Sequence, residues 1–342
     1  MDETQGAPGA RGTGRGTGRR PGARTAHGTA RTGAAAPAAG PESGRPRRGR
    51  AAAGASLAVA ALLTAGALTA CDSSSETRTH GAPAKKRPAP VWNRSPDTLA
   101  AVGDSITRAF DACLVLSDCP EASWATGTDK EVRSLAMRLI GGEPADLADR
   151  TWNYARTGAR ITDLPRQMTQ AGARQPELVT VMVGANDACR DSAEAMTPVA
   201  DFRASFTSAL RELRRTAPKA QVYVSSVPDL KRLWATGKDN PLGRAVWKLG
   251  ICASMLGDAE DVSSRAEQRR TAVQQRVKDY NGVLRDVCAK DTRCRYDGGE
   301  VFDYRFGDEM LSRWDWFHPS KDGQSALAEI AYRNITAERP PR

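Results

Sequence analysis

Short apolar runs alternate with longer amphipathic stretches over the last two thirds of the chain. The continuously apolar or β-branched run at 178–183 is typical of a central parallel strand that helices cover on both faces. The same reasoning predicts five strands in all, the last one weaker, at 98–102, 151–155, 177–183, 221–227 and 295–302.

Helices are predicted between these runs. In 266–289 apolar residues recur three and four positions apart, and helices are also expected at 130–140, 198–215 and 323–333. The alternation of strand and helix predicts an α/β fold, a three-layer α/β/α sandwich around a mostly parallel sheet of about five strands. In such sheets ligands bind at the carboxyl ends of the strands.

The first 96 residues have a different composition. Residues 1–50 hold twelve glycines and no aromatic residue, which predicts a disordered leader rich in Arg, Gly and Ala. Residues 51–70 carry no charge, follow an arginine-rich segment and run into Cys71, which is a signal-peptide layout. Leu68-Thr69-Ala70-Cys71 resembles a bacterial lipobox, and this resemblance implies lipidation of Cys71 and cleavage just before it.

Two alternatives to this leader stay open. Twenty uncharged residues at 51–70 are long enough to span a bilayer, although most of them are small. The pair Arg47-Arg48 allows twin-arginine export as well as the general route. Residues 72–96 are polar and contain prolines, which predicts a flexible tether that ends at a domain spanning 97–338. We therefore expect an exported protein, either secreted or held on the outer face of the membrane through Cys71.

The formal net charge of +10 is unevenly distributed. Residues 1–70 contain ten arginines and three acids, so they contribute +7 and leave only +3 for the rest. Nucleic-acid binding needs a dense basic face, and the predicted cleavage would remove the arginines. We expect no nucleic-acid partner.

Six cysteines remain after Cys71. An even number in an exported domain predicts three disulfides, although the sequence alone does not choose among the possible pairings. No Cys-x-x-Cys motif occurs and no histidine lies near a cysteine, so a metal site is not expected. Our prediction joins neighbours along the chain: Cys113–Cys119, Cys189–Cys252 and Cys288–Cys294.

Polar residues follow three of the predicted strands. Ser105 ends the motif Gly103-Asp104-Ser105 ahead of a predicted helix start at 106–110, where free N–H groups would favour an oxyanion. Gly158 follows the second strand and Asn186 the third. Each motif alone is typical of an ordinary turn or cap, but together they lie at one edge of the sheet.

A histidine base can come from only one position in the predicted domain. The chain has three histidines, and His318 is the only one outside the leader and tether. Asp315 precedes it by three residues, a spacing at which a carboxylate can reach one ring nitrogen and leave the other free.

These four blocks resemble, in order and spacing, those of the SGNH hydrolases, also called the GDSL esterase/lipase family. The resemblance covers about 97–337 and implies a flavodoxin-like fold, with Ser105 as nucleophile, His318 as base and Asp315 as its orienting acid. It also implies an oxyanion hole formed by Ser105, Gly158 and Asn186. Ile106 replaces the commoner leucine. The cysteines and the segment 229–250 look like the secreted actinobacterial lipase branch.

The resemblance implies a carboxylic ester substrate, either a lipid or a small acyl ester, and no cofactor. A carbohydrate deacetylase with the same triad and a catalytically silent lipoprotein binding module remain alternatives. Asp104 and Asp187 are expected to be structural hydrogen-bond partners. The apolar residues between Leu230 and Ile251 could line an acyl groove, but their helical spacing favours packing in the core.

Overall fold

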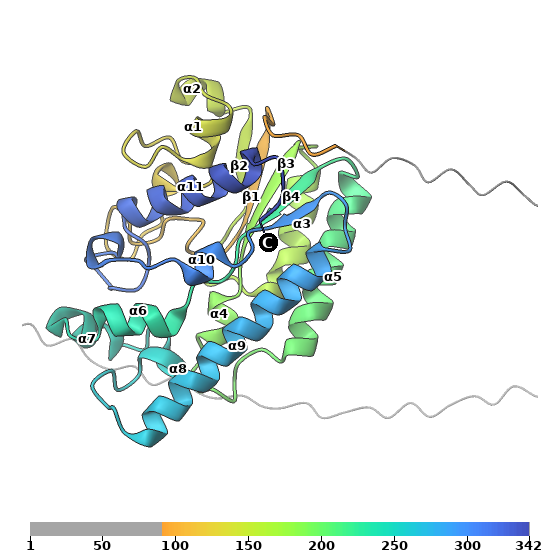
Figure 1. The fold of residues 1–342 in the computed structure, drawn as a ribbon. Helices are drawn as coiled ribbons and strands as arrows, with labels where there is room; N and C mark the ends of the chain where they lie inside the picture. Colours follow the sequence, from red (N-terminus) through yellow and green to blue (C-terminus); the bar gives the residue numbers. More distant parts are fainter. Residues whose placement is uncertain (1–90, 342) are drawn as a thin grey trace, which may run out of the picture. The chain divides into compact units, whose positions relative to one another are not determined.

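The computed structural model describes residues 91–341. A five-stranded sheet lies between two groups of helices, which confirms the predicted α/β sandwich (Figure 1). The strand order is β2-β1-β3-β4-β5. The strands are β1 (Leu99–Gly103), β2 (Thr151–Asn153), β3 (Leu178–Met182), β4 (Gln221–Val224) and β5 (Cys294–Tyr296).

Every pairing in the sheet is parallel. Ala101 of β1, for example, lies opposite Asn153 of β2 and Thr180 of β3. All five carboxyl ends therefore lie at one edge of the sheet, which we call the carboxyl edge, and the amino ends lie at the other, the amino edge. The order along the sheet places β1 between β2 and β3, so the residues that follow these three strands are neighbours.

Helices cover both faces of the sheet. In Figure 1, α3 (Leu164–Gly172), α5 (Val199–Thr216) and α9 (Ser264–Cys288) lie on one side, and α1 (Leu135–Leu139) and α11 (Lys321–Thr336) on the other. The shorter helices are α2 (Pro144–Leu147), α4 (Ala185–Ala188), α6 (Leu230–Gly237), α7 (Pro241–Trp247), α8 (Ala253–Leu256) and α10 (Glu300–Asp303), with 3₁₀ turns at Pro120–Ala122, Ile161–Asp163 and Asp308–Met310. None of the helices within 91–341 is long and apolar enough to cross a membrane.

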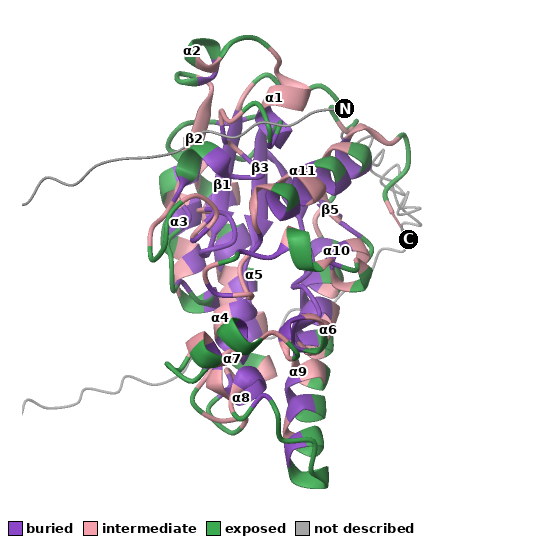
Figure 2. Cartoon of the chain, turned by 90° about the vertical axis from the view of Figure 1, so that its left-hand side faces the viewer, coloured by how far each residue is buried: buried purple, intermediate pink, exposed green. Residues whose placement is uncertain are grey.

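The core lies between the sheet and the helix faces turned toward it, as Figure 2 shows by colour. All residues of β1 and β3 are buried, as expected for central parallel strands. Between α5 and α9, the rings of Phe202 and Tyr280 stack at 4.1 Å.

Several predicted elements are longer than the observed ones. The strand expected at 221–227 ends at Val224. The strand expected at 295–302 ends at Tyr296, because Asp297 accepts hydrogen bonds from the N–H groups of Gly299 and Val301 and turns the chain into α10. The helix expected at 130–140 begins only at Leu135, where the hydroxyl of Ser134 caps it by accepting from Met137 N–H.

The folded domain begins before the predicted boundary at 97. The indole N–H of Trp92 donates to the carbonyl of Ile335 at 3.0 Å, and the guanidinium of Arg295 lies 4.3 Å over the Trp92 ring. Trp92 therefore fixes this segment to the domain ahead of the predicted boundary. The predicted leader, signal peptide, lipidation site at Cys71 and the tether up to residue 90 lie outside the described residues.

The six cysteines form three disulfides in the structure, and the pairs coincide with those expected from the sequence. Cys113–Cys119 and Cys288–Cys294 each close a short loop with a sequence separation of 6, whereas Cys189–Cys252 has a separation of 63. The long-range bond ties the segment after α4 to the start of α8.

Candidate active site

Ser105 lies in a tight turn directly after β1. Gly103 is required there, since its φ is +144° and an added Cβ would lie 2.0 Å from the carbonyl oxygen of Met182. Asp104 then closes the turn by accepting a hydrogen bond from Ile106 N–H at 3.0 Å. The helix start expected at 106–110 is wrong: these residues form turns, and Ala109 has a φ of +51°. The Ser105 N–H is therefore not presented by a helix end.

Two buried glutamines hold this turn from opposite faces of the sheet. Gln167 of α3 accepts from Gly103 N–H at 2.7 Å and donates to the Gly103 carbonyl at 2.9 Å. Gln324 of α11 donates to the Ile106 carbonyl at 2.9 Å and accepts from Trp124 N–H at 2.9 Å. The sequence analysis missed both glutamines, although each is a polar residue on the inward face of an amphipathic helix.

The loop between Leu311 and Pro319 brings His318 and Asp315 to Ser105. His318 Nε2 lies 2.8 Å from Ser105 Oγ, and His318 Nδ1 lies 2.5 Å from Asp315 Oδ2. The other carboxylate oxygen of Asp315 accepts from the N–H groups of Phe317 and His318, both at 2.9 Å. Serine, imidazole and carboxylate thus form one continuous hydrogen-bonded chain.

Charges and hydrogen bonds among Ser105, His318 and Asp315 make the imidazole of His318 more basic. Burial alone would lower the pKa of His318, but the hydrogen bond and negative charge of Asp315 outweigh it, and the pKa is raised. Burial would raise the pKa of Asp315, but its bond to His318 lowers the pKa below the ordinary value. Asp315 therefore stays ionised while His318 can accept a proton from Ser105.

Asn186 and Gly158 lie near one another, beside the hydrogen-bonded serine, imidazole and carboxylate. Asn186 belongs to α4, and its side-chain amide donates to the carbonyl of Ala159, the residue after Gly158, at 3.0 Å. Gly158 has a φ of +79°. Within residues 91–341, the backbone N–H groups of Ser105 and Gly158 donate to no protein acceptor. Both N–H groups are therefore available to an oxygen of a bound molecule.

A small apolar cavity of about 20 Å³ opens beside Ser105. Ser105, Asn186 and His318 line one side of it. The rest of the lining is apolar: Ile106, Ala185, Pro228, Leu230, Leu233, Phe306, Leu311, Phe317 and Pro319. A cavity of this size holds little more than one water molecule, so without rearrangement it could take at most a methyl group, such as that of an acetyl ester.

The apolar residues of the segment after β4 have two different roles: some line the cavity and others pack in the core. Leu230 and Leu233 line the cavity, whereas Trp247 is 2% exposed and lies in the core. The indole N–H of Trp247 donates to the backbone carbonyl of Asp315 at 2.7 Å, which fixes the loop. Among the aromatic residues of that loop, Phe317 lines the cavity and Trp316 packs against Gly243 of α7.

Asp187 has the structural role expected from the sequence. It accepts hydrogen bonds from Ile161 N–H at 2.9 Å and from the hydroxyl of Thr197 at 2.7 Å. Burial raises the pKa of Asp187 to about 6. Asp104 is also structural through one oxygen, but its Oδ2 has no hydrogen-bond partner within the described residues, and burial raises its pKa to about 7.

Asp111 is a third carboxylate near the triad that the sequence analysis did not identify. It is buried, and its carboxylate lies within 4.8 Å of ligand atoms of Asp315 and His318. Burial and the charge of Asp315 raise the pKa of Asp111 to about 6. No motif marks this residue, because an aspartate six positions after a serine is typical of any loop.

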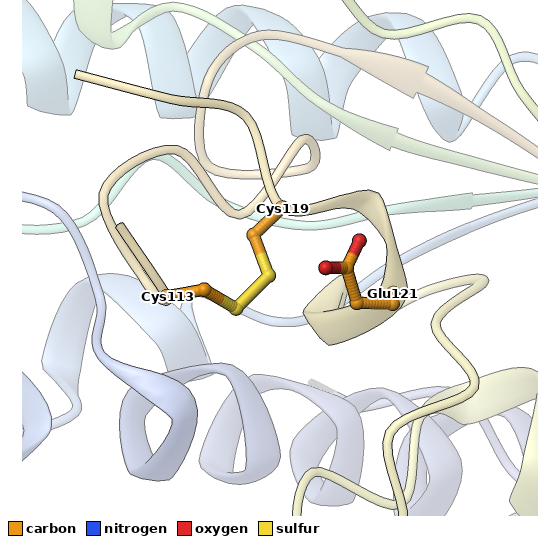
Figure 3. A group of neighbouring side chains, drawn as sticks. All are labelled: Cys113, Cys119 and Glu121. Atoms are coloured by element: carbon orange, nitrogen blue, oxygen red, sulfur yellow. A yellow bond between two sulfur atoms is a disulfide. The ribbon is translucent and has the colours of Figure 1, made fainter. Parts of the chain in front are cut away.

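Two clusters of side chains bring potential metal ligands together. The first contains Cys113, Cys119 and Glu121 (Figure 3). Both of its sulfur atoms belong to a disulfide, so neither is a thiolate that could bind a metal. The second contains Asp111, Asp315 and His318, and two of these already form the hydrogen-bonded chain to Ser105.

Hydrogen-bonded serine, histidine and aspartate residues at the carboxyl edge of a parallel α/β sheet are an arrangement that recurs in serine hydrolases. The profile of the GDSL-like Lipase/Acylhydrolase family matches residues 99–331. The chain belongs to this family, which confirms the family resemblance of the four sequence blocks. A search among curated proteins found no match.

Several solved structures are similar to this chain at low identity. An extracellular lipase from Streptomyces rimosus is 20% identical over 70% of this chain and 99% of that chain, with a TM-score of 0.41. A phospholipase A1 from Streptomyces albidoflavus NA297 is 19% identical over 71% and 100%, with a TM-score of 0.41. A family 3 carbohydrate esterase from Clostridium thermocellum is 14% identical over 69% and 93%, with a TM-score of 0.42. Likenesses this weak say nothing about the substrate.

Proposed function

We propose that the protein is a serine esterase that hydrolyses carboxylic esters with small acyl groups. The observation that carries the proposal is the continuous chain from Ser105 Oγ through His318 to Asp315. His318 takes the proton from Ser105 as its oxygen attacks the ester carbonyl, and then gives that proton to the leaving alcohol. Water attacks the resulting acyl-enzyme by the same route in reverse and releases the acid.

The oxyanion of each tetrahedral intermediate would be held by three donors. Two of them are the N–H groups of Ser105 and Gly158, which have no acceptor among the described residues. The third is the side-chain amide of Asn186, which uses one hydrogen for Ala159 and retains the other. Donors fixed in this way need little reorganisation when negative charge develops.

The test is a series of p-nitrophenyl esters with acyl groups of two to sixteen carbons, assayed with the wild type and the Ser105→Ala variant. We expect the highest kcat/KM at the short end and no turnover in the variant. Equal turnover by both proteins would reject Ser105 as the nucleophile.

A matched pair of variants tests the acyl cavity. Leu233→Ala removes part of its lining and should shift the preference toward longer acyl groups. Trp247→Phe removes a residue that supports the Asp315 loop without lining the cavity. It should lower the rates on short and long esters in equal proportion. A chain-length shift in Trp247→Phe, or none in Leu233→Ala, would place the acyl group elsewhere.

The small volume of the cavity favours a second candidate function, the removal of acetyl groups from carbohydrate. An acetylated sugar and p-nitrophenyl acetate share the acyl group and differ in the alcohol. Comparing kcat/KM on acetylated xylan or chitin fragments with that on p-nitrophenyl acetate separates the two functions. A preference for the sugar esters of a hundredfold or more would favour deacetylation.

We also propose export and lipid anchoring at Cys71, in the actinobacterial lipoprotein manner that the sequence implies. The uncharged segment at 51–70, the lipobox-like residues and the three disulfides of the domain support it. Mass spectrometry of the membrane fraction should find an N-terminal peptide that begins with an acylated Cys71. An N-terminal peptide that retains residues before Cys71 would contradict this proposal.

A further inference from the structure

Exposed apolar side chains gather around the loop that carries His318. Leu114, Val115 and Leu116 follow one another in the chain and are 66%, 55% and 78% exposed. Scattered exposed leucines are ordinary, but a contiguous apolar patch marks a contact surface. In residues 91–341 the large exposed apolar residues are Val91, Leu114, Val115, Leu116, Leu242, Leu249 and Val262.

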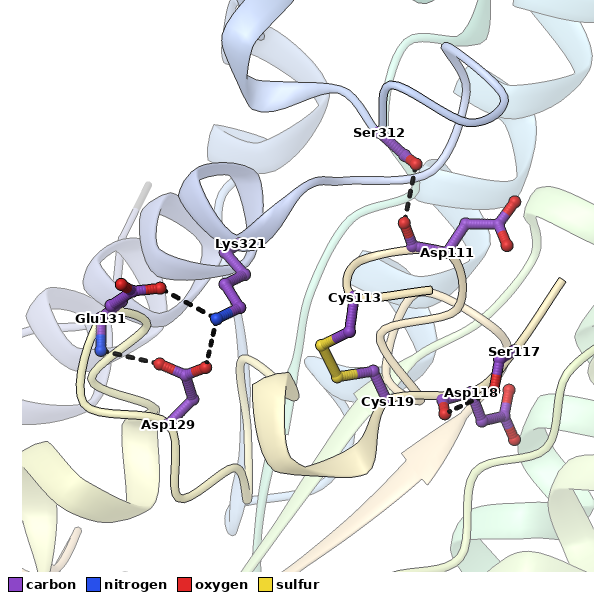
Figure 4. The surroundings of a disulfide bond; sticks show 9 residues. All are labelled: Asp111, Cys113, Ser117, Asp118, Cys119, Asp129, Glu131, Ser312 and Lys321. Atoms are coloured by element: carbon purple, nitrogen blue, oxygen red, sulfur yellow. Dashed lines mark hydrogen bonds and ion pairs between the residues drawn. A yellow bond between two sulfur atoms is a disulfide. The ribbon is translucent and has the colours of Figure 1, made fainter. Parts of the chain in front are cut away.

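These three side chains sit on a rigid support, which we call the 113–119 loop (Figure 4). Cys113 and Cys119 close it covalently. Inside the loop, Leu116 N–H donates to the Asp111 carboxylate at 2.5 Å, and Asp111 N–H donates to the Ser117 carbonyl at 2.9 Å. Cys119 N–H donates to the carbonyl of Arg108 at 3.1 Å. These bonds fix the backbone of the loop, and its three apolar side chains stay exposed to water. Their exposure adds nothing to the free energy of folding.

The base of the 113–119 loop touches the active site. The ring of Phe110 packs edge-on against His318 at 5.1 Å, and the hydroxyl of Ser312 donates to the Asp111 carbonyl at 2.7 Å. Leu311 lines the catalytic cavity and also an open hollow of about 760 Å³ that Cys113 and others border. The hollow therefore adjoins the catalytic cavity at Leu311 and the 113–119 loop at Cys113.

An amphipathic pair, Arg313 and Trp314, borders the same hollow. Trp314 is half-buried beneath the guanidinium of Arg313, which lies 4.6 Å over its ring. Indole and guanidinium groups are suited to the boundary between water and lipid. On the other side of the His318 loop, exposed Leu242 precedes Gly243, which packs against Trp316.

The charges around the hollow indicate which kind of lipid surface could contact it. Its acidic residues outnumber its basic ones, and one basic residue, Lys321, is paired with Asp129 and Glu131. A surface of anionic lipid would be repelled, whereas a neutral or zwitterionic one would not. The acidic residues that border the hollow are Asp111, Glu131, Asp308, Glu309 and Asp322.

We propose that the 113–119 loop, with Trp314 and Leu242, seats the active site on a neutral lipid surface. The proposal rests on the esterase function above and names where that esterase finds its substrate. The nineteen residues between Cys71 and Val91 would reach about 60 Å when extended. The chain enters the domain at the amino edge, where Asn93 N–H donates to Gln221 at the start of β4, so this length would have to span the domain before the carboxyl edge could face a membrane.

The test uses the predicted mature chain from residue 71 onward with Cys71→Ser, so that neither an acyl anchor nor the uncharged segment 51–70 contributes to binding. The double variant Leu114→Ser/Leu116→Ser is compared with Val262→Ser, which removes an exposed apolar residue just before α9. One readout is flotation with phosphatidylcholine vesicles, and the other is hydrolysis of tributyrin as a monomer and as phosphatidylcholine-coated droplets. Because the tether is common to all variants, differences between them report on the loop.

We expect the double variant to bind vesicles at least about tenfold more weakly than the wild type and to lose a similar factor on droplets, since each leucine leaves water on binding. Its rate on monomeric tributyrin should stay within about twofold, and Val262→Ser should match the wild type throughout. Replacing phosphatidylcholine by phosphatidylglycerol should not enlarge the difference between wild type and double variant.

Several results would overturn the proposal. One is equal vesicle binding and equal droplet rates in the double variant and the wild type. Another is a dimer in sedimentation that the double variant abolishes, which would assign the patch to a second copy of the chain. Vesicle binding tests the lipid-surface proposal even if the protein has no esterase activity. Absence of turnover on monomeric ester would contradict the esterase function without deciding the binding result.

Discussion

Two loops of equal length are closed by disulfides at opposite edges of the sheet. The 113–119 loop follows β1 at the carboxyl edge, and the loop closed by Cys288–Cys294 joins α9 to β5 at the amino edge. The second loop is polar and paired, since Asp291 accepts from Arg293 N–H at 2.9 Å and from Arg214 at 2.6 Å. The first instead exposes apolar side chains. A disulfide stabilises both loops. Only the loop at the carboxyl edge exposes apolar side chains, which do not contribute to the stability of the fold.

Buried carboxylates show the same contrast between the edges. Asp104, Asp111 and Asp187 follow β1 and β3 at the carboxyl edge, and burial raises the pKa of all three. Asp291 at the amino edge is paired with Arg214. Buried carboxylates, whose ionisation lowers the stability of the fold, therefore concentrate at the edge where Ser105, His318 and Asp315 lie, as is common at functional sites.

The largest expected effect comes from Asn186 at the carboxyl edge. Asn186→Ala should lower kcat on a short ester by about a hundredfold to a thousandfold, because one oxyanion donor is lost. Asn186→Asp keeps the shape but replaces the amide by a carboxylate, and it should lose at least as much. Near-normal kcat in either variant would remove Asn186 from the oxyanion hole. Arg214→Ala at the amino edge should leave kcat unchanged.

The two short disulfides sharpen the comparison further. In the chain-entropy picture a loop of this length contributes about 2 kcal/mol to the free energy of unfolding. Cys113→Ser/Cys119→Ser and Cys288→Ser/Cys294→Ser should therefore destabilise the protein to a similar extent in urea. Only the first pair should also lower the rate on tributyrin droplets relative to the monomer. A selective loss of droplet activity in the second pair would contradict the contrast between the edges.

Asp104 makes stability depend on pH in a defined direction. Its pKa in the fold is about 7, above the ordinary value of 3.8, so the folded state binds this proton more tightly. Its contribution to stability is complete below about pH 4 and is lost as the pH rises through 7. Asp104→Asn should match the wild type only below about pH 4 and become progressively more stable than it as the pH rises, by roughly 4 kcal/mol at pH 8 at about 1.4 kcal/mol per pKa unit, measured by urea unfolding. A wild-type advantage at pH 8 would show that the carboxylate is satisfied.

The smallest effect is expected at Asp111, which acts on the triad through charge. Its carboxylate contributes to the raised pKa of His318. Asp111→Asn should therefore move the acidic limb of the kcat/KM profile to lower pH, while the plateau changes by less than about threefold. Asp118→Asn, in the same loop, is the matched control and should leave the limb in place. An unchanged limb in Asp111→Asn would show that the two residues are not coupled.

The sequence predicts the sheet and the triad because both depend on local patterns. Continuous apolar runs mark buried parallel strands, and a single histidine outside the leader and the tether identifies His318 without any structure. The carboxyl-edge rule then places Ser105 and Asn186 together. The turn after Ser105 was mistaken for a helix because 106–110 lacks the strong signals, proline or glycine, that interrupt one.

The rest of the site depends on contacts between residues far apart in the chain. Gln167 and Gln324 hold the nucleophile turn across 64 and 218 positions of sequence, and no local pattern encodes such pairs. Trp247 supports Asp315 from 68 residues away. Asp111 becomes a neighbour of His318 only when the 113–119 loop folds back on the 311–319 segment.

The most direct test of the account is to label the protein with a fluorophosphonate and locate the adduct by mass spectrometry. The hydrogen-bonded chain from Ser105 to Asp315 predicts a single adduct, on Ser105, that forms far more slowly in His318→Ala. A folded wild type that gives no adduct, or an adduct on another residue, would contradict the assignment of Ser105 as an activated nucleophile.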